Sequence, residues 1–117
     1  MQFSKSLKLN HLFRRLYQKG NSTVNKHLVV YCRKNKLQEN RIGLTVSAKL
    51  GHAVVRNRVR RRLREIYRLN EARFTPGWDI VVVARSRAVD APYQKLEAAY
   101  LSAADKLGLL RKDEKNG

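Results

Sequence analysis

Cysteine and clustered acids are scarce in this 117-residue chain. Cys32 is the only cysteine, which excludes an internal disulfide and any zinc site built from several cysteines. The acidic residues stand singly, apart from Asp113 and Glu114 near the end, whereas a metal-dependent nuclease needs clustered carboxylates to hold its ions. The three histidines show no ligand spacing either. The chain is therefore expected to contain no catalytic and no metal-binding residue of its own.

Long hydrophobic runs are also missing. The longest apolar runs contain about five residues, far fewer than the roughly 20 that a helix needs to cross a bilayer. The first residues, MQFSKSLKLNHLF, contain no continuous apolar segment like that of a secretory signal. No amphipathic segment with a bulky apolar face is left unassigned, so a membrane-surface binder is only a distant alternative. We expect a soluble protein of the cytoplasm.

Positive charge is what the chain has in excess. Its 26 Lys and Arg residues against 9 Asp and Glu leave a formal net charge of +17. Self-repulsion of this size destabilises a compact domain unless an anionic partner offsets it. Hydrophobic residues make up 43% of the sequence, which is enough for a folded core. The length predicts one domain over residues 1–117, with a short polar tail over about 111–117.

Capping and turn residues mark where the elements begin and end. Asn10 can cap a first helix, and Gly20 suits a left-handed position at the end of that helix. Residues 21–25 are polar and are expected to form a loop. Residues 33–40 are expected to form a hairpin loop between two strands. A further turn is predicted over 75–78, where proline is followed by glycine.

Hydrophobic periodicity assigns the elements between these breaks. Residues 27–33 and 41–49 alternate as half-buried strands do, and residues 78–85 are apolar on both faces, as in a central strand. The last helix opens at Asp90 and Pro92, and its apolar face contains Leu96, Tyr100, Ala103, Leu107 and Leu110. The resulting order, α-β-β-α-β-α, predicts an α/β fold: a two-layer sandwich around a small mixed sheet.

The segment VVRNRVRRRLREIYR, residues 54–68, contains seven arginines and one glutamate. As a helix over about 53–70 it would pack on a sheet through one narrow apolar stripe, which contains Val55, Val59, Leu63 and Ile66. A solvated charged face is the alternative, but Glu65 alone cannot neutralise seven guanidinium groups, whose planar forks suit phosphates. The expected partner is a phosphate backbone, and the candidate contact residues are Arg56, Asn57, Arg58, Arg60, Arg61, Arg62, Arg64 and Arg68.

Aromatic residues among the basic ones indicate which kind of nucleic acid is bound. Phe13 and Tyr17 lie four apart on the first helix, and Tyr31 lies on a strand. Aromatic rings beside a basic groove stack on unpaired bases, which favours a single-stranded ligand. A place in the core is the alternative for all three rings and above all for Phe13, whereas both tyrosines carry hydroxyls and are expected to border solvent. Nothing in the sequence has the spacing of a helix-turn-helix or zinc-finger reader of duplex DNA.

Taken together, these segments resemble a known family. The stretch RIGLTVSAKLGHAVVRNRVRRRLREIYR resembles the protein subunit of bacterial ribonuclease P. That family carries an R-N-R signature on its basic helix, here Arg56-Asn57-Arg58, after a strand that ends in a turn like VSAKLGHAV. The similarity extends to LKLNHLFRRLYQKG, HLVVYCR and WDIVVVAR, so it covers nearly the whole chain.

The resemblance implies a protein without its own catalytic centre, which binds a large catalytic RNA. That RNA would cleave the 5′ leader from precursor transfer RNA with magnesium ions, while the signature helix faces the RNA. A cleft between the first helix and the sheet would take the leader. The residues at the matching positions are Phe13, Tyr17 and Tyr31, with Ser47 and Lys49 near the edge of the cleft. No membrane and no obligatory protein partner is implied.

Two further expectations come from the resemblance. The fold would contain a strand-helix-strand crossover of the rare left hand, where general rules predict a right-handed one. Tyr17 stands where phenylalanine is common in the family, so stacking should survive although the contact with the base can differ. The rival interpretations are a basic ribosomal or general RNA-binding protein, which needs no organised aromatic cleft, and a self-sufficient nuclease, which needs clustered carboxylates.

Overall fold

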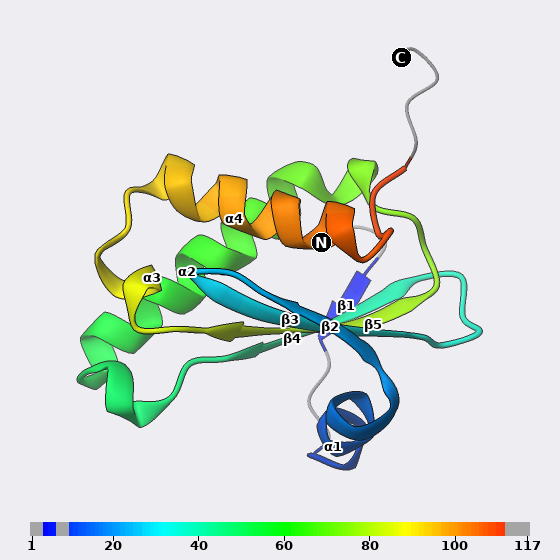
Figure 1. The fold of residues 1–117 in the computed structure, drawn as a ribbon, viewed down its shortest axis with the longest axis horizontal. Coiled ribbons are helices and arrows are strands. Elements are labelled where there is room, and N and C mark those ends of the chain that lie inside the picture. The colour runs from blue at the N-terminus through cyan, green and yellow to red at the C-terminus, as the bar shows by residue number, and fades with distance from the viewer. Residues whose placement is uncertain (1–3, 7–9, 112–117) are drawn as a thin grey trace.

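The computed structural model describes residues 4–6 and 10–111 of the chain, with side chains from residue 13 to residue 111. Its centre is a mixed β-sheet, with helices α2 and α4 on one face and helix α1 on the other (Figure 1). The polar tail beyond residue 111 and the side chain of Asn10, predicted to cap the first helix, lie outside the described residues. The α/β class with a small mixed sheet is confirmed.

The sheet has five strands in the order β1-β4-β5-β3-β2. The central strand β5 pairs in parallel with β4 and antiparallel with β3, as its apolar sequence predicted. β1 adds to β4 in parallel, and β2 adds to β3 antiparallel. The bounds are β1 Ser4–Ser6, β2 Asn21–Val24, β3 Leu28–Lys34, β4 Asn40–Thr45 and β5 Trp78–Ala84.

The helices begin and end close to their capping signals. α1 spans Asn10–Lys19, the arginine helix α2 spans Ala53–Asn70, and α4 spans Tyr93–Lys106. The short elements are the helix α3 over Arg87–Asp90 and the 3₁₀ turns η1 over Ala48–Leu50 and η2 over Glu71–Arg73. β4, α2 and β5 form the crossover between parallel neighbours that the resemblance implies, and its hand stays a prediction.

The main core lies between the sheet and the helices α2 and α4. Leu63 and Ile66 of α2 are fully buried there, together with Leu96 of α4. Strand β3 contributes its buried residues Leu28, Val30 and Cys32 to this face, as its alternation predicted. Burial of these side chains is the largest favourable contribution to folding in a domain of this size. No helix of the described residues is both long and apolar enough to cross a membrane.

Two strands and one connection differ from the sequence prediction. The polar segment after α1 is not a loop but strand β2, because its backbone groups pair with those of β3 even though its side chains are mostly exposed. β1 was not predicted, since three residues carry no readable alternation. The connection 35–39 is not a hairpin loop, because β5 lies between β3 and β4 in the sheet.

The backbone conformation at Gly20 also differs from the prediction. Gly20 does not adopt the predicted left-handed conformation, since positive φ occurs among the described glycines at Gly51, Gly77 and Gly108. A Cβ at Gly20 would instead lie 2.7 Å from the carbonyl oxygens of Leu16 and Cys32, so the close approach of α1 to β3 requires glycine.

The last helix begins later than predicted. Asp90 ends α3, and Ala91 is extended before Pro92, as residues before proline tend to be. Leu110 lies beyond the end of α4, where it forms a bridge with Phe74. The apolar face predicted for one continuous helix is therefore shared between α4 and the segment that follows it.

Candidate nucleic-acid interface

The arginine helix α2 packs through the predicted stripe. Val59, Leu63 and Ile66 are buried against the sheet, and Val55 is half-buried near the start of the helix. Tyr67 and Asn70 are buried as well, and the sequence analysis did not place either inside. Asn70 was missed because it is polar; its amide donates to the Ile66 carbonyl and to the carboxylate of Glu97 on α4. The stripe fixes which face of the helix points outward.

The outward face of α2 presents a row of cationic groups. Among the eight candidate contact residues, the exposed ones are Asn57, Arg58, Arg61, Arg64 and Arg68, and the half-buried ones are Arg56, Arg60 and Arg62. Arg68 forms a two-bond ion pair with Glu65 at 3.1 and 2.6 Å, and this hydrogen bonding lowers the pKa of Glu65. The single carboxylate of the helix therefore neutralises one guanidinium group.

The remaining arginines of α2 differ in whether their guanidinium groups have a partner within the protein. Arg56 donates to the Gly51 carbonyl at 3.2 Å, and Arg62 donates to the Ala91 carbonyl at 2.8 Å, so both anchor the helix to neighbouring loops. Arg60 donates to the side chain of Asn57. Arg58, Arg61 and Arg64 form no hydrogen bond or ion pair within the described part of the chain, so their guanidinium groups are available to an external anion.

The three predicted cleft aromatics come together on the opposite face of the sheet. The ring centroid of Tyr17 lies 4.7 Å from that of Tyr31 and 6.4 Å from that of Phe13, and both pairs meet edge to face. Tyr17 is 42% exposed, whereas Phe13 and Tyr31 are half-buried against Leu16 and Val81. The structure thus brings together residues from α1 and β3 that are distant in the sequence, and leaves part of their rings accessible.

This side of the sheet, called here the open face, is only partly covered by α1. In the strand register, Tyr31 lies opposite Val81, and Val81 lies opposite Gly43. The next row toward the ends of β4 and β5 contains Val29, Val83 and Thr45, all half-buried. These three residues were not predicted as site residues, although the two-residue alternation of the strands assigns them to the same face as Tyr31.

Ser47 and Lys49 lie at the end of the open face, not within the aromatic cluster. Both are exposed in the turn after β4, where the Ser47 hydroxyl accepts a hydrogen bond from the Lys49 backbone at 3.2 Å. The turn continues through Gly51 into α2, so it connects the open face with the first arginines of the helix. A Cβ on Gly51 would meet Val55 at 3.1 Å, and its φ of 144° also favours glycine.

Comparison with known proteins gives one consistent result. The family model described as Ribonuclease P matches residues 1–108. A ribonuclease P protein component from Alkaliphilus metalliredigens is 46% identical over 110 residues, which cover 94% of this chain and 99% of the relative. The one from Clostridioides difficile is 45% identical over 95 residues, covering 80% of this chain and 83% of the relative.

Solved structures give the same result at the level of the backbone. The ribonuclease P protein of Staphylococcus aureus is 33% identical, with a TM-score of 0.84 over 91% of this chain and 97% of that one. The protein from Thermotoga maritima is 31% identical, with a TM-score of 0.78 over 84% and 93% of the two chains. By sequence and by fold, the chain belongs to the ribonuclease P protein family.

Proposed function

We propose that this chain is the protein component of a cytoplasmic ribonuclease P, in which it binds a catalytic RNA and the 5′ leader of precursor transfer RNA. The observation that carries the proposal is the accessible Tyr17–Tyr31 pair on the open face, in a chain that also carries an arginine helix. A general RNA-binding protein needs the helix alone. The names of the relatives support the assignment to ribonuclease P.

In this proposal α2 holds the phosphate backbone of the catalytic RNA. Arg58, Arg61 and Arg64 are exposed and lack internal partners within the described residues, so phosphates would relieve their mutual repulsion. Arg56 and Arg62 would act partly by fixing the helix to its neighbouring loops. Contacts of this kind position an RNA without reading its sequence.

The open face holds the single-stranded leader. An unpaired base can stack on the accessible part of the tyrosine rings, and such stacking is worth roughly 1–3 kcal/mol per base. Phe13 supports the pair from α1, where it packs beside Leu16 and Val81. Lys49 and Ser47, at the end of this face, supply a cation and a hydroxyl close to where the leader would pass toward α2.

The chemistry of cleavage is assigned to the RNA, whose phosphates would hold the magnesium ions. Two of the carboxylates of this chain already have guanidinium partners: Asp79 is paired with Arg41, and Glu65 with Arg68. The contribution of the protein is therefore to bind and orient the two RNAs. No other protein is required in the proposal.

The leader assignment is tested by comparing two RNAs. Tyr17→Leu and Tyr31→Leu should weaken binding of a precursor transfer RNA to the reconstituted particle by about 5- to 150-fold, since each removes one stacking ring. Binding of mature transfer RNA should barely change. Tyr17→Phe keeps the ring and serves as the matched control. Equal weakening of both RNAs would favour the rival, a general RNA-binding protein.

The location of catalysis is tested by removing carboxylates one at a time. Asp90→Ala, Glu39→Ala and Glu65→Ala should each leave single-turnover cleavage measurable at saturating magnesium. Asp79 is 6% exposed and paired with Arg41, so Asp79→Asn is preferred there, because alanine would leave a guanidinium group without its partner. Complete loss of cleavage in any variant that folds and binds both RNAs would identify a carboxylate of the protein as catalytic.

A further inference from the structure

A basic pocket opens at the other end of the open face. It is a cavity of about 250 Å³ between α1 and the connection 35–39 that follows β3. Its charged lining groups are Arg15, Arg33, Lys34, Lys36, Arg41 and Asp79. With five cations and one carboxylate, these side chains carry a net charge of +4. Residues 33–40 were predicted to form a hairpin loop, and none of the pocket residues was a predicted site residue.

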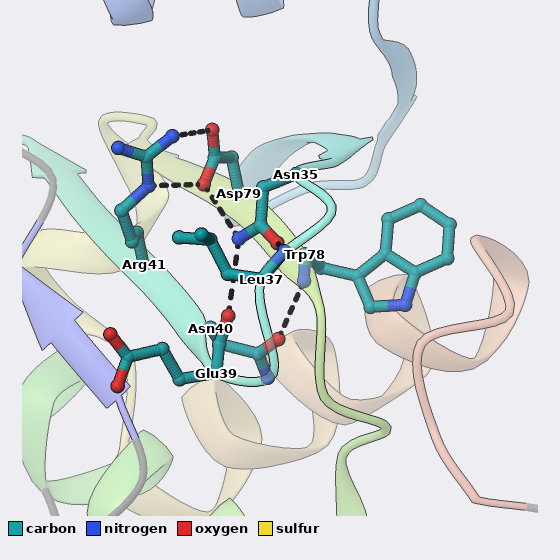
Figure 2. A network of polar contacts seen from close by, with 7 residues as sticks. All are labelled: Asn35, Leu37, Glu39, Asn40, Arg41, Trp78 and Asp79. Carbon is teal, nitrogen blue, oxygen red and sulfur yellow. Dashed lines mark hydrogen bonds and ion pairs between the residues drawn. The ribbon is translucent and has the colours of Figure 1, made fainter.

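The carboxylate in the pocket does not oppose an anion, because it is already fully engaged. Arg41 donates two hydrogen bonds of 2.7 Å to the two oxygens of Asp79, and Asn35 donates a third at 3.0 Å (Figure 2). The hydrogen bonding with Asp79 also raises the pKa of Arg41, which stays charged. The pocket therefore presents cations around a neutralised pair.

The same contacts hold the connection in a fixed shape. The Asn35 amide also donates to the Glu39 carbonyl at 3.1 Å, and its oxygen accepts from the Leu37 backbone at 2.7 Å (Figure 2). Asn40, next along the chain, accepts from the Trp78 backbone at 2.8 Å. A ligand that binds here would need to order little backbone, which lowers the entropic cost of binding.

Three of the pocket cations have no partner among the residues that the structure describes. Lys34 lies over the ring of Trp78, 5.8 Å from its centroid, and Arg41 is paired with Asp79. Arg15, Arg33 and Lys36 form no ion pair with any carboxylate within the described ranges. Like charges around one small cavity repel, so an anion with several acceptor oxygens would stabilise the group. Arginine forks suit a phosphate group.

The pocket continues the row of residues that carries the aromatic cluster. Arg33, Asp79 and Arg41 lie opposite one another in the register, two residues away along each strand from the row of Tyr31, Val81 and Gly43. Two residues along a strand span about 7 Å, so the two rows are neighbours on the open face. Leu16 is shared, since it packs on Val81 and also lines the pocket.

The two ends of the open face differ in what lies beyond them. Ser47 and Lys49 follow the end of β4 and lead into α2, whereas Arg41 and Asp79 lie at the starts of β4 and β5. A leader that enters from the catalytic RNA at α2 and stacks on Tyr31 would therefore run on into the basic pocket. Its nucleotides there are the ones farther from the cleavage site.

We propose that this pocket binds backbone phosphates of the 5′ leader, upstream of the bases that stack on Tyr17 and Tyr31. The inference rests on the proposed function of the open face and extends it by one phosphate site. It makes the pocket a sensor of leader length: a short leader reaches the tyrosines only, and a longer one also fills the pocket.

The experiment measures binding of the reconstituted particle to precursors whose leaders grow by one nucleotide at a time. With the wild-type protein, affinity should rise once when the leader reaches the tyrosines and again when it reaches the pocket. Arg33→Ala/Lys36→Ala should remove the second rise only, which weakens long-leader binding by about 5- to 25-fold near 0.1 M salt if two phosphate contacts are lost. Arg33→Lys/Lys36→Arg keeps both charges and should retain most of the rise.

Arg73→Ala/Lys106→Ala is the matched control, because it removes one arginine and one lysine exposed on the helical side of the sheet. Equal weakening of short-leader, long-leader and mature RNAs by the pocket variant would overturn the inference and assign these cations to the catalytic RNA. Unchanged binding of long leaders would overturn it as well. Failure of the proposed function looks different: the wild-type protein itself would show no dependence on leader length.

Discussion

The two faces of the sheet are built from the same strands for different purposes. On β3, Leu28, Val30 and Cys32 point to α2 and α4 and are fully buried, while Tyr31 points to the open face and stays half-buried. The face covered by α2 and α4, called here the helical face, buries nearly all of its apolar side chains. Among the described residues, the open face is covered by α1 alone, and its aromatic and basic groups stay accessible. In the proposed function, the alternation of a strand thus separates the residues that stabilise the fold from those that bind RNA.

The largest expected effect concerns the helical face. Leu63→Ala should lower the free energy of unfolding by about 2–5 kcal/mol, since it leaves a cavity in the core. Leu37→Ala, at a side chain that is 45% exposed, is the matched change and should stay within about 0.5 kcal/mol. Urea unfolding measures both. Similar losses of stability in the two variants would contradict the expected difference between buried and exposed leucines.

The next effect separates the arginine helix from the open face. Arg61→Ala/Arg64→Ala should flatten the dependence of log affinity on log salt by about 1–2 units, because two phosphate contacts are lost. Tyr17→Leu should weaken precursor binding without changing that slope, since a stacked ring releases no counterions. Filter binding of the catalytic RNA and of the precursor at several salt concentrations gives both values. An unchanged slope in the arginine variant would mean that these side chains are solvated surface.

A smaller effect is expected from a buried hydroxyl on the helical face. The Tyr100 hydroxyl is fully buried and has no hydrogen-bond partner among the described groups. Since a buried polar group without a partner costs roughly 1–3 kcal/mol, Tyr100→Phe should raise the free energy of unfolding by about 1 kcal/mol. Thermal unfolding measures it, with Tyr17→Phe on the open face as a control of little effect. A clear loss of stability would show that the hydroxyl has a partner in solution.

The last effect is absent near neutral pH and appears only in alkaline solution, as a pH dependence that originates in β3. Burial raises the pKa of the Cys32 thiol to about 11 from its ordinary value of 9.0. Between these values the unfolded chain loses the proton that the folded chain keeps, so the contribution of Cys32 to stability falls as pH rises. The stability curves of wild type and Cys32→Ala should approach each other from pH 9 to pH 11. Parallel curves would contradict a raised pKa.

Much of the fold follows from local sequence patterns. The stripe of α2 and the alternation of β3 depend on side-chain periodicity, and both were predicted with nearly their observed bounds. β2 was missed because its stability comes from backbone pairing with β3 and not from buried side chains. The hairpin prediction failed for a related reason: insertion of β5 between β3 and β4 is a long-range event that residues 35–39 do not encode.

The candidate site likewise contains features that local sequence predicts and features that depend on the tertiary structure. Periodicity placed Phe13 and Tyr17 on one helix face, but the 4.7 Å contact between Tyr17 and Tyr31 depends on how α1 crosses β3. The basic pocket was invisible because Arg15 and Arg41 belong to different elements and meet only in the folded sheet. The engagement of Arg56 and Arg62 by backbone carbonyls likewise needs the positions of neighbouring loops.

The central place of β5 has a consequence for the synthesis of the chain. β5 is the last strand to leave the ribosome, yet it joins β3 to β4 and supplies Val81, on which Leu16 and the aromatic residues pack. Loop closure over such separations is slow, and in the folded sheet β3 and β4 are joined only through their pairing with β5. A nascent chain that stops before Trp78 therefore has all three aromatic residues and the arginine helix but no folded open face. In the proposed function, leader recognition would therefore begin only after β5 has been synthesised and has joined β3 to β4.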